Sequence, residues 1–128
     1  MTAYVFTSHP YPARVEFVPT KSAWRALMRR LAIPDEPYPD TSGRCTQLVH
    51  ASHPDLILIT FSPEADTRHS TEVIGLMAHE IVHAVQYLEQ STGSRFDSET
   101  QAYLTQALLQ WLMNSYAAAG RTFKDSTP

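Results

Sequence analysis

The sequence predicts a single α+β domain, in which a small, mostly antiparallel sheet from the first half of the chain packs on two helices from the second half. The chain has 128 residues, which is the usual size of one domain and enough for a hydrophobic core. Hydrophobic residues make up 43% of it and charged residues 18%, as in an ordinary globular protein. Eight of the nine prolines lie between Pro10 and Pro63. Because proline breaks helices, only the second half is free to form long ones.

We expect three parts within this single domain, which spans residues 1–128. Residues 1–63 should form a half rich in strands and turns with one short helix. Residues 64–120 should form a helical half, and residues 121–128 a loose tail. The boundary between the halves falls where the internal prolines stop, and Gly120 is expected to end the last helix.

Four segments of the first half have the composition of strands. Ala3–Phe6 and Arg14–Val18 form a first pair, separated by a turn-rich stretch. Cys45–Ala51 and Leu56–Phe61 form a second pair, and His53–Asp55 between them should be the tight turn of a hairpin. The last strand opens with a continuous apolar run, so it suits a central strand covered on both faces.

A short helix and a loop separate the two pairs of strands. Thr20 can cap a helix over Lys21–Leu31, in which apolar residues recur at helical spacing. The segment Pro34–Gly43 holds three prolines, two aspartates and a glycine, so it should form a loop.

The first helix of the second half should begin near Ser70 or Thr71, either of which can cap it. It should extend to about Leu88 or Gln90. Apart from Glu80, no charged residue occurs between positions 73 and 88, so this helix is expected to be buried against the sheet.

The second helix should begin at Asp97 or Ser98. Ser98 and Gln101 fit a capping box, in which each side chain bonds the other's free backbone N–H. Gly120 should end this helix, because glycine readily adopts the left-handed conformation found after helix C-termini.

Residues 79–83 read His-Glu-Ile-Val-His, an HExxH motif that falls within the first of these helices. Helix positions four apart lie on one face, so His79 and His83 can offer imidazole nitrogens to one metal ion. Glu80 lies about 100° around the helix, from where it can act as a general base on a water held by the metal. Two imidazoles, together with a carboxylate ligand from outside this helix, suit zinc better than calcium or magnesium.

Glu99 is the expected third zinc ligand. Open catalytic zinc sites use three protein ligands plus water, and a helical hairpin can carry Glu99 back toward the histidines. Asp97 competes for this role. As a helix cap, however, Asp97 would use its carboxylate to accept hydrogen bonds from backbone N–H groups instead of binding zinc. A helix that reached Gln90 would leave His83 about 10 Å from its end. The prediction therefore needs the helix to stop earlier or the connector to fold back.

Three further residues lie where they can serve such a site. Gly75 interrupts the helix at a cost of about 1 kcal/mol, one turn before His79 on the same face, and is interpreted as clearance for the metal or a substrate. Gln86 shares the face of His83 and can bond its other ring nitrogen. Tyr103 can donate a hydrogen bond to a developing oxyanion, or it can simply pack between the two helices.

The pattern Gly75–Gln86 followed by Glu99–Tyr103 resembles the gluzincin metallopeptidases. It is most similar to their minimal versions and to small HExxH proteins encoded in bacteriophage and prophage genomes. The resemblance covers roughly residues 70–106 and implies a zincin-like fold, with a small sheet over the HExxH helix and a following helix that bears a glutamate. It also implies a sheet edge strand that aligns an extended peptide by main-chain pairing.

This resemblance implies a zinc metallopeptidase. His79, His83 and Glu99 would hold zinc, and a zinc-bound water activated by Glu80 would hydrolyse a bond in a peptide or protein substrate. The alternative is a zinc-stabilised, phage-related binding or structural protein with little or no turnover, whose metal should be closed by a fourth protein ligand. A third reading is a zinc hydrolase of a non-peptide amide, because the motif fixes the water chemistry and not the substrate.

Composition excludes several other classes. The formal net charge of −3 argues against nucleic-acid binding, and the cluster Arg25, Arg29 and Arg30 is interpreted as the solvent side of a short helix. The single Cys45 excludes an internal disulfide and a cysteine-rich zinc ribbon, and fits a reducing compartment. Neither a signal peptide in Met1–Pro12 nor a bilayer-spanning stretch is visible. We therefore expect a soluble, cytoplasmic protein without nucleic-acid or membrane partners.

Overall fold

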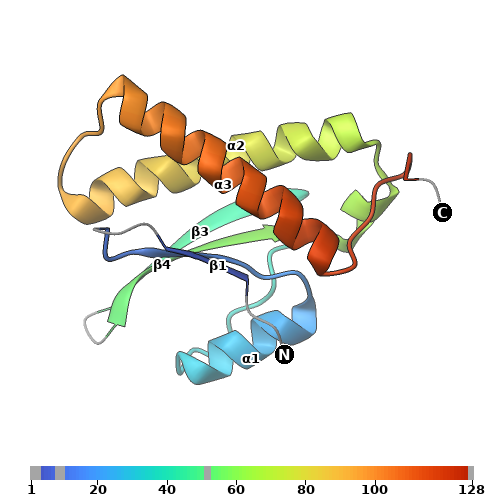
Figure 1. Ribbon diagram of the computed structural model, residues 1–128. Helices are drawn as coiled ribbons and strands as arrows, with labels where there is room; N and C mark the ends of the chain where they lie inside the picture. The colour runs from blue at the N-terminus through green and yellow to red at the C-terminus, as the bar shows by residue number, and fades with distance from the viewer. Residues whose placement is uncertain (1–3, 8–10, 51–52, 127–128) are drawn as a thin grey trace.

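The computed structural model describes residues 4–7, 11–50 and 53–126, and within them the chain forms an α+β fold with a four-stranded mixed sheet and three α-helices (Figure 1). The α+β class predicted from the sequence is confirmed. In the sheet the strands follow the order β1 (Tyr4–Thr7), β2 (Arg14–Phe17), β4 (His53–Phe61) and β3 (Gly43–His50).

Two of the three strand pairings are antiparallel, those of β1 with β2 and of β3 with β4. The third pairing, between β2 and β4, is parallel, with Val15 opposite Ile57. Parallel neighbours need a crossover, and the helix α1 (Lys21–Arg30) lies in the connection that provides it. This order leaves β3 at one edge of the sheet.

The strand β4 is covered on both faces, as its apolar run predicts. Ile57 and Ile59 belong to the core under α2 (Ser70–Thr92) and α3 (Ser98–Ala118), whereas Leu56 and Leu58 pack with residues of α1. Figure 1 shows α1 on one side of the sheet and the two long helices on the other. Of these two, α2 lies over β3 and β4, and α3 over β1 and β2.

The helix α1 begins as predicted, because Thr20 Oγ1 accepts a hydrogen bond from the N–H of Ala23 at 3.0 Å. The predicted cap of α2 is wrong. His69 caps this helix instead, and its Nδ1 accepts from the N–H of Thr71 at 3.2 Å. The helix then continues past the expected end to Thr92.

The cap of α3 is Asp97, whose Oδ1 accepts from the N–H of Thr100 at 2.7 Å. The capping box of Ser98 and Gln101 is therefore wrong, because Asp97 already occupies the capping position. The side-chain amide of Gln101 donates instead to Glu89 and to a backbone carbonyl. At the other end α3 stops at Ala118, just before a glycine with a φ of 79°.

Two predictions about loops are wrong. His53–Asp55 is not a turn but the start of β4, since His50 pairs with His53 across the hairpin. The tail is not loose over residues 121–126. The Arg121 guanidinium donates to Asp66 at 2.6 Å and to the Ser62 carbonyl at 2.8 Å. The predicted strand ends Ala3 and Ala51, residues 8–10 of the turn-rich stretch predicted over Ser8–Pro12, and the last two residues of the tail lie outside the described residues.

None of the helices in the described part of the chain combines the length and the apolar character that spanning a lipid bilayer requires.

Candidate metal centre

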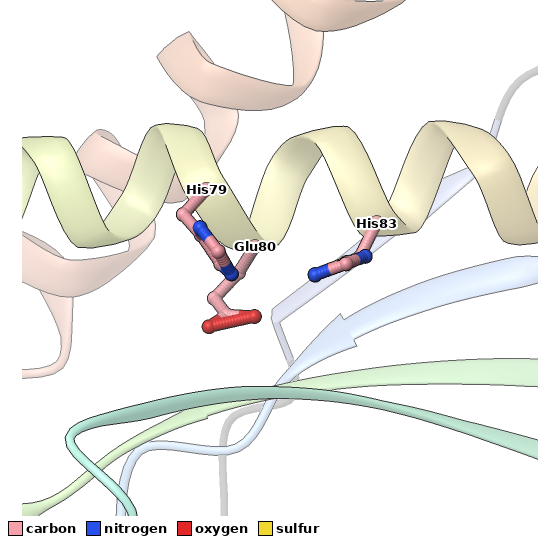
Figure 2. A group of neighbouring side chains, drawn as sticks. All are labelled: His79, Glu80 and His83. Carbon is pink, nitrogen blue, oxygen red and sulfur yellow. The ribbon is translucent and has the colours of Figure 1, made fainter.

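His79, Glu80 and His83 project from α2 toward the edge strand β3 (Figure 2). One ligand atom from each residue lies within 4.8 Å of the others, and the two imidazole rings are 4.9 Å apart between centroids. His79 is exposed, His83 is half-buried and Glu80 is only 4% exposed. In residues 4–7, 11–50 and 53–126 this is the only group of three side chains arranged to hold a metal ion.

The buried face of α2 fixes where these side chains point. Val73, Met77, Ile81 and Ala84 are 0% exposed and pack in the core between helices and sheet. Burying this face fixes the rotation of the helix about its axis. The histidines, four residues apart, consequently lie side by side at the border of the core, where α2 passes over β3.

Gln86 orients one of the histidines. Its Oε1 lies 3.1 Å from Nδ1 of His83. When Nδ1 carries the proton and donates to Gln86, the Nε2 lone pair of His83 is free for a metal. The structure thus places Gln86 in the position expected from the sequence. This arrangement is typical of metal-binding histidines.

Glu80 is held closely against β3. A Cβ added to Gly43 would lie 3.1 Å from Oε2 of Glu80 and 3.2 Å from two ring carbons of Phe61, so a larger residue would force these side chains to shift by a few tenths of an ångström. Burial raises the pKa of Glu80, and the charges of the two histidines and of Arg44 offset part of that rise. A raised pKa makes the carboxylate a better proton acceptor.

A cavity of about 610 Å³ opens beside His79, on the side of the α2 N-terminus. Its lining includes two charged residues that the sequence analysis missed, Arg68 and Glu72. Arg68 donates from Nη2 to Ser42 Oγ at 3.0 Å. Glu72 precedes His79 by seven residues and so shares its helix face, a spacing that the sequence already displays. Arg68 also pairs with Glu64, four residues earlier, which the sequence displays, but no local pattern indicates its contact with Ser42, 26 residues away.

Gly75 also lines this cavity, as the sequence analysis expected of a residue that gives clearance. A Cβ added to Gly75 would have no heavy atom of the protein within 4 Å. Packing against the rest of the chain therefore does not account for glycine at this position, and the clearance hypothesis depends on a ligand.

The structure does not bring Glu99 into the histidine group. Glu99 is exposed in the first turn of α3, and α2 continues for nine residues beyond His83, a rise of about 13 Å. The early end of α2 on which this ligand depended is thus not observed. The competitor Asp97 is occupied as a helix cap. Tyr103 does not pack between the helices either, because it is 68% exposed.

No family model matches the chain, and no curated protein and no solved structure does either.

Proposed function

We propose that this protein is a zinc-dependent peptidase of the HExxH type with a zincin-like fold. The observation that carries the proposal is the convergence of His79, Glu80 and His83 beside the edge strand β3. The two histidines offer nitrogens close enough to share one ion, and their spacing is that of the HExxH motif.

The residues present fit a zinc ion. His79 and His83 would hold it through imidazole nitrogens, with Gln86 orienting His83. Zinc, when bound, would supply Lewis-acid chemistry, lowering the pKa of a water and polarising the scissile carbonyl. Glu99 remains the proposed third ligand on the strength of the sequence resemblance alone.

Glu80 is the proposed general base. Its carboxylate would take a proton from the attacking water while the water oxygen bonds to the carbonyl carbon. The same carboxyl group would then give that proton to the leaving nitrogen as the C–N bond breaks. Its burial raises its pKa, and a carboxylate with a raised pKa accepts a proton more readily than an exposed one.

The edge strand β3 is the proposed docking element for the substrate. One side of β3 pairs with β4, which leaves main-chain N–H and C=O groups on its other side without a strand partner in the sheet. An extended peptide could pair there and pass beneath the three side chains of α2. A peptide or protein is therefore the proposed substrate class.

A second candidate is a metal-stabilised binding protein without turnover. One observation favours it. Glu80 lies within 4.8 Å of both histidine nitrogens and can itself act as a third protein ligand beside the two histidines. Structural zinc sites of this kind contribute folding free energy.

Zinc content and peptide hydrolysis, measured on the same preparations, separate the two candidates. As a general base, Glu80 is dispensable for binding, so Glu80→Gln should keep about one zinc per chain and lose hydrolysis. If Glu80 is instead a zinc ligand, the Glu80→Gln protein should lose its zinc. His83→Ala should lose both properties in either case. Asp35→Asn, which removes an exposed carboxylate from the loop after α1, is the control and should retain both. Hydrolysis that survives in Glu80→Gln would contradict the proposed mechanism.

A further inference from the structure

One face of α2 carries Glu72, Gly75 and His79 at spacings of three and four residues, so they lie in a row along the helix. All three line the 610 Å³ cavity, together with the half-buried Leu76. Thr41–Gly43, the segment that leads into β3, forms part of its lining from the sheet side. Seven residues separate the first and last members of the row, which is a rise of about 10 Å.

Glu72 supplies the charge in this cavity that the protein does not neutralise. Its side chain is exposed and, within the described part of the chain, makes no hydrogen bond or ion pair, although its backbone N–H donates to the His69 carbonyl at 3.0 Å. Arg68 lines the same cavity, but its Nη2 lies 2.8 Å from Glu64 Oε1 and 3.0 Å from Ser42 Oγ, so its charge is already paired. Glu80 belongs to the histidine group. This end of the cavity is therefore negatively charged and complementary to a cationic ligand.

Gly75 independently indicates that something enters the cavity. Neither packing nor backbone conformation requires glycine there, because an added Cβ meets no heavy atom within 4 Å and its φ is not positive. Inside a helix glycine is less favourable than alanine. Glycine leaves open space midway between Glu72 and His79, in which the aliphatic part of a ligand's long side chain can lie.

We propose that this cavity is a subsite for a lysine or arginine side chain of the substrate, with Glu72 binding its charge and Gly75 making room for its stem. The inference rests on the proposed function, since it places the basic residue next to the bond that is cleaved. An extended chain advances about 3.3 Å per residue. A basic side chain one or two residues from that bond can therefore cover the remaining distance to Glu72 with its flexible stem.

Peptide binding to the zinc-loaded Glu80→Gln protein and to the metal-free wild type tests this without turnover. The probes are short fluorescein-labelled peptides of alanine and serine that differ only at one central position, which is lysine, norleucine or glutamate. Fluorescence polarisation should show the lysine peptide binding about three- to fivefold more tightly than the norleucine peptide, as expected for an exposed ion pair. Glu72→Gln should remove this preference, and Asp35→Asn, which deletes the same charge elsewhere, should keep it.

Gly75→Ala provides a readout that a merely structural role would not give. It should raise the thermal midpoint of the protein while it weakens binding of the lysine peptide. Equal binding of the three peptides, including no detectable binding of any of them, overturns the inference. So does a lysine preference that survives in Glu72→Gln. The proposed function fails separately, if the wild-type protein with bound zinc cleaves none of the peptides while the lysine preference remains.

Discussion

Replacing Gly43 and Gly75 by alanine should change stability in opposite directions, although both glycines line the same cavity. At Gly43 the new carbon would lie 3.1 Å from Oε2 of Glu80 and 3.2 Å from the Phe61 ring. Phe61 is 0% exposed and belongs to the core, so its ring cannot shift without disturbing its neighbours. Overpacking of this kind costs about 1–3 kcal/mol, and we expect a loss of about 1–2 kcal/mol for Gly43→Ala. Gly75→Ala meets no neighbour and should gain about 1 kcal/mol from helix propensity.

Urea unfolding followed by circular dichroism measures both changes. With a slope of about 2 kcal/mol/M, typical of small proteins in urea, the midpoint should fall by roughly 0.5–1 M for Gly43→Ala and rise by roughly 0.5 M for Gly75→Ala. Equal slopes in all three proteins are needed, because they show that the denatured states are comparable. A Gly43→Ala midpoint at or above that of the wild type would refute the close approach of Glu80 to β3. A lowered midpoint for Gly75→Ala would refute the open space beside His79.

Three other predictions concern stability and reactivity away from the metal centre. Arg121→Met should lower the free energy of unfolding by about 2 kcal/mol, less than for a fully buried pair because Asp66 is 31% exposed. An unchanged melting temperature would contradict this. The Cys45 thiol, whose pKa is raised by burial, should react with a thiol reagent only after urea unfolding, and prompt labelling of the native protein would show otherwise. Hydrogen bonds from Ser70 lower the pKa of Asp125, so the stabilisation is present above the unfolded-state pKa of about 4 and is lost as the pH falls through the lower folded-state value. Urea unfolding should therefore show a deficit for Asp125→Asn at about pH 7 that shrinks at about pH 3, and a constant deficit would contradict it.

Features that depend on neighbouring residues could be predicted from the sequence. Thr20 caps α1 because its hydroxyl reaches an N–H three residues away, and this relation is visible in the sequence itself. The shared face of His79 and His83 follows from helix periodicity in the same way. The burial of β4 on both faces follows from its uninterrupted apolar run.

Features that depend on distant parts of the chain could not be predicted. Glu80, 37 positions later in the chain, lies close to Gly43, and no local sequence pattern predicts that contact. Arg121 looks like part of a loose tail, yet it bonds the backbone of Pro19 and Phe61. The cap of α2 was missed for a different reason. Histidine is not among the usual capping residues, and His69 serves because its ring nitrogen happens to reach a free N–H.

The length of α2 determines what Glu99 can do. The two long helices are joined by a short connector, so the part of α3 level with the motif lies about nine residues beyond its start. There α3 presents the buried Leu104 and Leu108 and no carboxylate. Glu99 is level with the last turn of α2, and it can reach a zinc ion at His83 only if that turn rearranges. Zinc lost from Glu99→Ala would therefore show that metal binding remodels the end of α2, and circular dichroism should then differ between the metal-free and zinc-loaded wild type. Zinc retained in that variant would show that the site is completed without α3.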